Sequence, residues 1–196
     1  MKKIGILASH EGTNFQAIID ACERGTLDAR PVVAISNNSN APALTRACKA
    51  GIATAHISSA THPDPDDLDR AILETFKRFD VDLVVTAGYM KKLGPRVLVE
   101  YRRRIVNIHP SLLPRHGGKG MYGLNVHRAV IECGDRETGI TVHYVDDEYD
   151  TGPVVAQQRL PVLANDTPES LAARVLEHEH DFLVEVLAKL IEAGDS

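Results

Sequence analysis

The sequence predicts an α/β protein with a mostly parallel sheet, helices on both of its faces, and antiparallel additions near the C-terminal part. Up to residue 108, short apolar runs alternate with longer amphipathic segments, as expected when each strand leads into a crossover helix. Beyond residue 110 this alternation stops, and two strand-like runs at 139–145 and 154–162 are separated only by a loop. We expect residues 1–196 to form a single domain.

The strands expected in the first half are short and apolar, which is typical of strands that are buried on both faces. They span residues 4–9, 31–36, 54–57, 82–87 and 105–108. Helices are expected at 14–25, from 42, at 68–79 and from 95. Asn14 is the predicted cap of the first helix, and prolines open the second and fourth. This order predicts a Rossmann-like sheet.

The helix expected over 68–79 has one buried face, because Leu68, Ile72, Phe76 and Phe79 recur at helical spacing. After a Pro- and Gly-rich loop at 110–123, a helix is expected at 126–133. A long amphipathic helix at 168–191 completes the predicted elements.

Composition excludes several classes of protein. The net charge is −5, with 22 basic and 27 acidic residues, so the sequence lacks the basic balance of a nucleic-acid-binding protein. The three cysteines are far apart and form no Cys-x-x-Cys pair, which argues against a disulfide framework and a structural zinc site. The N-terminal apolar run is too short for a signal peptide or a membrane span. Free thiols suit a reducing compartment, so we expect a cytoplasmic protein.

Three segments that follow expected strands should line one crevice. In open parallel sheets, ligands bind beyond the carboxyl ends of the strands. Residues 10–14, 88–93 and 107–114 all occupy such positions.

The first of these segments contains Gly12, Thr13 and Asn14 at the expected start of a helix. Backbone N–H groups and the helix dipole favour an anion there, Gly12 allows close approach, and Thr13 adds a hydroxyl donor. The motif is neither a P-loop nor Gly-x-Gly-x-x-Gly, so it indicates a single phosphate. An ordinary loop with an Asn cap explains the same residues equally well.

Asn107 and His109 are two residues apart on an expected strand, so both side chains point to the same face. An amide donor beside an imidazole can stabilise an oxyanion and move a proton. A hydrogen-bonded structural histidine is the alternative.

The acidic loop at 146–153 includes Asp150. A carboxylate near His109 would raise the imidazole pKa and keep the ring charged. A solvated acidic turn, or a calcium site without the spacing of an EF-hand, would explain the same residues. No His-x-x-x-His or His-Glu-x-x-His motif is present, so we expect no zinc.

Together these segments resemble one family. The sequence reads Gly-Thr-Asn-Phe-Gln-Ala-Ile at 12–18, Asn-Ile-His-Pro-Ser-Leu-Leu-Pro at 107–114 and Asp-Thr-Gly-Pro at 150–153. It also contains Ala-Gly-Tyr-Met at 87–90 and Thr-Gly-Ile-Thr-Val-His-Tyr-Val at 138–145. Over residues 4 to about 190, the chain resembles the folate-dependent phosphoribosylglycinamide formyltransferase family.

The resemblance implies a transfer of the formyl group of 10-formyltetrahydrofolate, a co-substrate, to the amine of glycinamide ribonucleotide in de novo purine biosynthesis. It implies that no metal, nucleic acid or membrane takes part, and that the protein is a monomer or homodimer. The implied catalytic residues are Asn107, His109 and Asp150. Gly12, Thr13, Asn14 and Glu179 are implied to bind the phosphate and ribose of the ribonucleotide. Met90, Lys91, Lys92, Leu93, Asn107 and Asp147 are implied to bind the folate.

The sequence departs from the family pattern at three places. Residues 10–12 read His-Glu-Gly where many members have Gly-Asn-Gly, which puts the Glu11 carboxylate near the expected phosphate. The loop at 115–123 is longer than in many relatives. It is either a mobile lid or an inserted surface loop. Residues 62–66 lack the arginine that many members have near the folate tail.

Four other functions are compatible with parts of this pattern. A formyltetrahydrofolate deformylase shares the catalytic residues but has an extra N-terminal domain, which we do not expect here. A methionyl-tRNA formyltransferase would have basic surfaces and a C-terminal RNA-binding domain. A sugar-nucleotide formyltransferase would use a different amine acceptor, and a ligand sensor would not need the catalytic residues.

Overall fold

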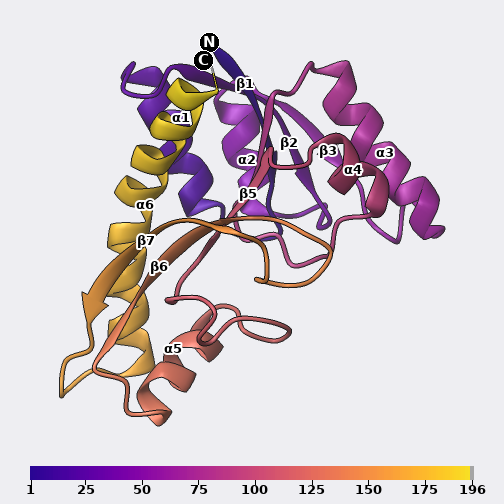
Figure 1. Ribbon diagram of the computed structural model, residues 1–196. Helices are drawn as coiled ribbons and strands as arrows, with labels where there is room; N and C mark the ends of the chain where they lie inside the picture. The colour runs from indigo at the N-terminus through magenta and orange to yellow at the C-terminus, as the bar shows by residue number, and fades with distance from the viewer. Residues whose placement is uncertain (195–196) are drawn as a thin grey trace.

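The computed structural model describes residues 1–194 and confirms the predicted α/β fold, with a seven-stranded sheet in the order β3-β2-β1-β4-β5-β6-β7 (Figure 1). The first five strands in this order run parallel, and β6 and β7 are antiparallel additions. The strands are β1 (Lys2–Leu7), β2 (Ala29–Ser36), β3 (Ala53–His56), β4 (Leu83–Thr86), β5 (Ile105–His109), β6 (Glu137–Tyr144) and β7 (Val154–Pro161). The helices are α1 (Thr13–Glu23), α2 (Pro42–Lys49), α3 (Pro65–Arg78), α4 (Pro95–Glu100), α5 (Leu124–Glu132) and α6 (Pro168–Ala193).

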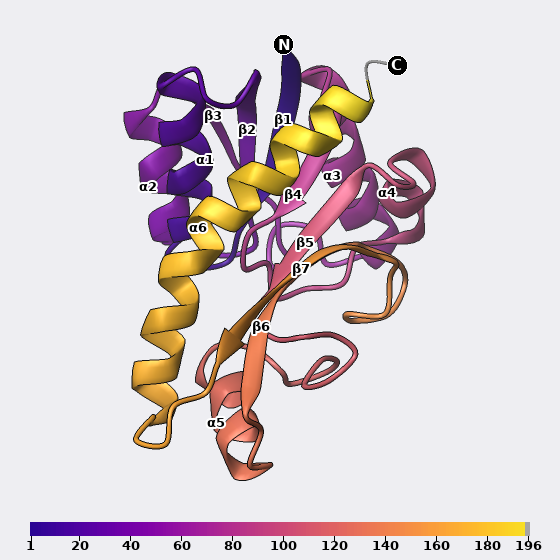
Figure 2. The same ribbon diagram turned by 60° about the vertical axis from the view of Figure 1, so that its left-hand side comes forward.

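Helices cover both faces of the sheet, as predicted. Along β1, Ile4 and Ile6 pack into one core with α1, α2, α5 and α6, whereas Leu7 packs into the other core with α3 and α4. This separation follows from the alternation of side chains along a strand. Figure 2 shows α6 crossing one face of the sheet diagonally, with α3 and α4 behind it.

Two helix starts differ from the sequence expectation. The cap of α1 is Gly12, which is left-handed with φ 67°, and no side chain caps this helix. The prediction that Asn14 is the cap is therefore wrong, because Asn14 lies inside the helix and its side chain points to α6. Helix α3 begins at Pro65 rather than at residue 68, because the Asp64 carboxylate accepts hydrogen bonds from two N–H groups of the first turn.

The carboxyl ends of β1, β4 and β5 lie side by side, so the three segments predicted to line one crevice do meet at the same edge of the sheet. The order reverses between β1 and β4, and such a switch point opens a crevice for ligands. The Ser9 N–H donates to the Gly88 carbonyl at 3.0 Å, and the Met90 N–H donates to Ser9 Oγ at 2.8 Å. These bonds hold the loops after β1 and β4 together.

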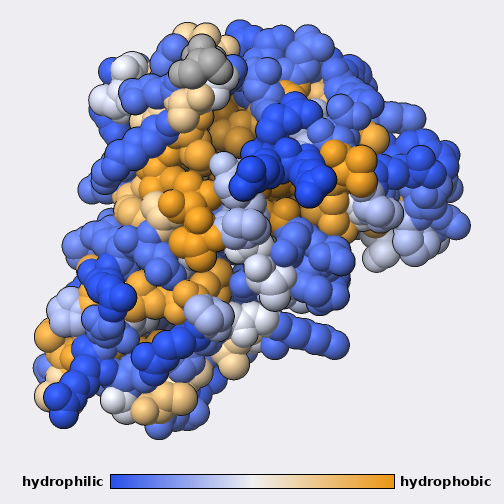
Figure 3. All heavy atoms as spheres, in the orientation of Figure 1, coloured by the Kyte–Doolittle hydropathy of each residue, from blue (hydrophilic) through white to orange (hydrophobic). Residues whose placement is uncertain are grey.

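The surface seen in the orientation of Figure 1 is mostly hydrophilic, with apolar residues gathered in its middle (Figure 3). Within residues 1–194, no helix has the length and apolar character needed to cross a bilayer.

Candidate active site

Three predicted catalytic residues meet where β5 ends. Asn107 and His109 lie on β5, and Asp150 lies in the loop between β6 and β7. His109 Nδ1 is 3.6 Å from one Asp150 oxygen, and His143 Nε2 is 3.5 Å from the other. Because β5 and β6 pair in register, His143 stands opposite Asn107 and becomes a fourth member of the cluster.

The Asn107 amide has a defined orientation. Thr86 Oγ1 donates to Asn107 Oδ1 at 2.7 Å, so Nδ2 is the opposite end of the amide. This nitrogen lies 3.1 Å from His143 Nε2. His143 Nδ1–H donates to the Tyr144 carbonyl at 2.8 Å, which leaves Nε2 to accept the Asn107 N–H. The second N–H bond of Asn107 is then available to a substrate oxygen.

His109 is only 4% exposed, and its two nitrogens have different partners. Nε2–H donates to the carbonyl of His116 at 2.9 Å, so the neutral ring carries no proton on Nδ1, the nitrogen that faces Asp150. Burial lowers the pKa of His109 more than the Asp150 carboxylate raises it. Asp150 thus raises the pKa of His109, as predicted, but the prediction that it keeps the ring charged is wrong, because the cost of burying the imidazolium is larger.

Asp150 occupies a strained backbone position with φ 60°, an uncommon value for a residue other than glycine. Burial would raise the pKa of Asp150, but the neighbouring His143 and His109 rings and the N–H of Gly118 together lower it. The Gly118 N–H lies 2.9 Å from Asp150 Oδ2. Asp150 is therefore an ionised carboxylate between two imidazoles.

The turn after Asp150 depends on Gly152. A Cβ atom at this position would lie 1.9 Å from the Tyr144 carbonyl oxygen, so only glycine lets the loop pass so close to β6. This close approach explains why the Asp-x-Gly pattern places a carboxylate beside β5.

Two further histidines at the site were not predicted from the sequence as functional residues. The backbone of His116 binds His109, as described above. His127 on α5 is 4% exposed, and burial, followed by the proximity of His109, lowers its pKa to about 4. The only sequence signal for His127 was its position in the expected helix at 126–133.

The predicted phosphate loop lies at the start of α1. A Cβ atom on Gly12 would approach the Cβ of Ala43 to 2.7 Å, and φ is 67°, so this position requires glycine. The Asn14 side-chain amide donates to Glu179 Oε2 at 2.7 Å. Burial raises the pKa of Glu179, which is 7% exposed. The structure thus brings Glu179 next to Gly12, Thr13 and Asn14, although they are far apart in the sequence.

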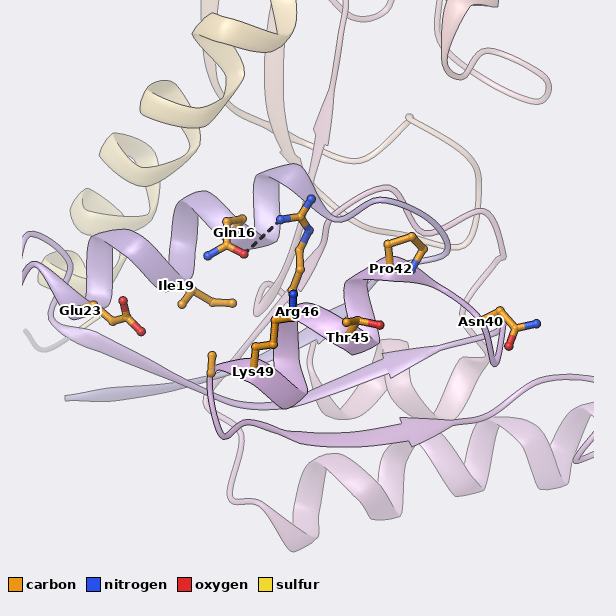
Figure 4. Close-up of a pocket in the computed structure, with 9 residues that line it drawn as sticks. Gln16, Ile19, Glu23, Asn40, Pro42, Thr45, Arg46 and Lys49 are labelled. Atoms are coloured by element: carbon orange, nitrogen blue, oxygen red, sulfur yellow. Dashed lines mark hydrogen bonds between the residues drawn. The ribbon is translucent and has the colours of Figure 1, made fainter.

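Two open grooves run along α1, the helix that follows this loop. One, of about 500 Å³, lies between α1 and α6 and includes Thr13 and Arg24 in its lining. The other, of about 520 Å³, lies between α1 and α2 (Figure 4). Arg46 lines both, and its guanidinium donates to the Glu11 carbonyl at 2.8 Å and to Gln16 Oε1 at 3.2 Å. Arg46 therefore brings positive charge to the side of the loop where Glu11 is exposed.

The segment predicted to bind folate lies against the acidic loop. Lys92 Nζ forms an ion pair with Glu148 at 2.8 Å and lies 5.4 Å from the centre of the Tyr149 ring. Asp147 and Lys91 are exposed nearby, whereas Leu93 is buried. The ion pair thus joins the loop at 88–93 to the loop at 146–150, which carries Asp150.

Among residues 1–194, no group of three or more His, Cys, Asp or Glu side chains could hold a metal ion. All three cysteines are free.

Comparisons with known proteins identify the family of the chain. The formyl transferase family profile matches residues 2–187. Phosphoribosylglycinamide formyltransferase of Haemophilus influenzae is 42% identical over 92% of this chain and 82% of its own length. The chloroplastic enzyme of that name from Vigna unguiculata is 43% identical over 97% of this chain, which spans only 61% of the plant protein.

A solved structure shares the whole fold. Glycinamide ribonucleotide transformylase 1 from Symbiobacterium toebii superposes with a TM-score of 0.91 and 39% identity, over 98% of this chain and 89% of that one. The chain belongs to the formyl transferase family and, within it, to the phosphoribosylglycinamide formyltransferases.

Proposed function

We propose that this protein transfers the formyl group of 10-formyltetrahydrofolate to the amine of glycinamide ribonucleotide, a step of de novo purine biosynthesis. The meeting of Asn107, His109 and Asp150 at the end of β5 is the observation that supports this most strongly. We assign the activity to residues 1–196 as one domain, with small-molecule substrates rather than nucleic acid. A cytoplasmic location would keep its three free cysteines reduced.

The two substrates approach the catalytic residues from different loops. The phosphate of the ribonucleotide binds the N–H groups of Gly12, Thr13 and Asn14, where the α1 dipole favours an anion. Glu179, held by Asn14, accepts hydrogen bonds from the ribose hydroxyls. The folate binds between residues 88–93 and the acidic loop with Asp147, so that its formyl group reaches Asn107.

The first half of the reaction forms the new C–N bond. The amine lone pair attacks the formyl carbon, and the C=O electron pair moves to oxygen. The free N–H of Asn107 donates to this oxyanion, and His109 Nδ1 takes the proton that the nitrogen must lose. The imidazolium that forms lies beside the Asp150 carboxylate, which stabilises it at this step.

The second half breaks the bond to the folate nitrogen. The oxyanion lone pair restores the C=O bond, and the C–N electron pair returns to the folate nitrogen, which takes the proton from His109 Nδ1. Formylated ribonucleotide and tetrahydrofolate leave, and His109 is neutral again. Burial lowers the pKa of His109, which leaves the ring neutral before the reaction and favours release of the proton to the folate nitrogen.

The test follows the absorbance of 10-formyltetrahydrofolate as it loses its formyl group, with and without glycinamide ribonucleotide. Turnover that requires the ribonucleotide is the expected result. Formyl loss to water at the same rate without it would replace the proposal with a deformylase. No formyl loss in either mixture would direct the search to another amine acceptor.

A further inference from the structure

We infer that His116 and Asp135 form a clamp that sets the tautomer of His109, and that both are positioning residues for proton transfer. The effect of the clamp on proton transfer rests on the proposed function. The clamp itself is present in the protein without substrates. Neither side chain touches the reacting atoms. They act through the backbone carbonyl of His116, which accepts the hydrogen bond from His109 Nε2.

The clamp is a buried hydrogen bond between a loop and the segment that follows α5. His116 Nε2 lies 2.7 Å from Asp135 Oδ2, and the two side chains are 12% and 7% exposed. The Arg115 guanidinium contacts the other Asp135 oxygen. The hydrogen bond from His116, together with the positive charge of Arg115, lowers the pKa of Asp135. An ionised carboxylate thus binds two consecutive residues of the loop.

The clamp holds the backbone in a conformation that it would otherwise leave. His116 has φ 53°, in the left-handed region, which is unfavourable for a residue other than glycine. The preceding carbonyl, of Arg115, is also fixed, because Ser111 Oγ donates to it at 2.6 Å. In this conformation the His116 carbonyl points at His109 Nε2. If the His116 side chain were released from Asp135, this peptide would relax and its carbonyl would no longer accept the hydrogen bond from His109.

The position of that carbonyl decides which nitrogen of His109 is free. With Nε2–H bound to the carbonyl, Nδ1 has a lone pair and can take the proton of the attacking amine. Without the His116 carbonyl, the Asp150 carboxylate, 3.6 Å from Nδ1, would favour a proton on Nδ1. A ring with that tautomer donates to Asp150 and cannot act as the base at this nitrogen. The first residues of the loop at 115–123 therefore position the catalytic histidine.

The direct test is ¹⁵N NMR of the histidine rings in the full chain, which reports which nitrogen of His109 carries the proton. The expected result for the natural protein is a proton on Nε2. In His116→Phe and Asp135→Ala we expect a proton on Nδ1 or a mixture of tautomers. His116→Gln should restore the natural spectrum, because a glutamine nitrogen can replace Nε2 as the donor to Asp135.

A matched control separates positioning from general stability. Asp166 is 4% exposed at its side chain and binds Arg174 on α6, so Asp166→Ala also removes a buried carboxylate from its partner. In the clamp variants kcat should fall at least about 10-fold, with KM for both substrates within about twofold, because a wrong histidine tautomer impairs the proton step. Asp166→Ala should lower the unfolding temperature but leave kcat and the His109 spectrum unchanged.

An unchanged His109 tautomer in folded His116→Phe would overturn the inference, as would an equal loss of kcat in Asp166→Ala. If Asp135→Ala does not fold, the comparison of His116→Phe with His116→Gln decides the question alone. If the natural protein shows no turnover with glycinamide ribonucleotide, the proposed function fails, while the NMR result still decides whether the clamp exists.

Discussion

Replacement of Asn107 by alanine tests the proposed oxyanion site. Thr86 holds Asn107 Oδ1 at 2.7 Å, so the nitrogen end faces His143 and has one N–H bond left for a substrate oxygen. Asn107→Ala removes this donor. Loss of one oxyanion donor costs about 2.7–4 kcal/mol of transition-state stabilisation. At about 1.4 kcal/mol for each factor of ten, kcat should fall about 10²- to 10³-fold.

The same substitution has a small expected effect on stability. The Thr86 hydroxyl retains the Val106 carbonyl at 3.3 Å as a partner, and His143 loses one hydrogen bond. The expected loss of unfolding free energy is about 1 kcal/mol. Thermal unfolding measurements therefore show whether a loss of activity comes from unfolding.

The assay measures kcat and both KM values from the absorbance change in the presence of glycinamide ribonucleotide. Thr86→Val is the matched comparison, because it keeps the amide but removes the bond that orients it. We expect a loss of kcat of about 10-fold or less in that variant. A folded Asn107→Ala protein with kcat within about fivefold of the natural value would refute the oxyanion role.

Three further predictions test other parts of the site. Asp150→Asn should lower kcat at least about 10²-fold, because the imidazolium loses its partner. Calorimetry should still detect ribonucleotide binding, and a loss of turnover together with a loss of binding would contradict the assigned role. Gly12→Ala should raise KM for the ribonucleotide and lower stability, whereas Gly25→Ala, with φ 71° and no atom within 4 Å of the added Cβ, should lower stability alone; equal KM values in the two variants would speak against the phosphate loop. The pKa of His127 is lowered from 6.5 to about 4, so the unfolded chain binds the proton more tightly and stability is lost as pH falls from about 6.5 to about 4, by about 3 kcal/mol at most. His109, whose pKa is also lowered, contributes in the same direction. His127→Gln should shrink the decrease in unfolding temperature between pH 7 and pH 5, and an unchanged decrease would exclude His127 as its cause.

Much of the fold follows from local patterns. The alternation of apolar runs and amphipathic segments predicted the parallel strands, the helices on both faces and the antiparallel pair, all of which the structure confirms. Boundaries were less accurate where a cap decides them. Asp64 lengthens α3, and the left-handed Gly12 replaces Asn14 as the cap of α1. Local propensity does not reveal that Asn14 has a better partner on α6.

The sequence by itself determined the fold class, the edge of the sheet at which the three segments meet and the residue types found there. Those conclusions depend on the period of side chains along a strand and on the motifs of a family, which are local properties. Only the tertiary structure decided the protonation of His109, since its pKa depends on burial as well as on Asp150. The same holds for the contacts of His116 with Asp135 and of Asn14 with Glu179. These pairs join distant parts of the chain, and burial and long-range contact exist only once the chain has folded.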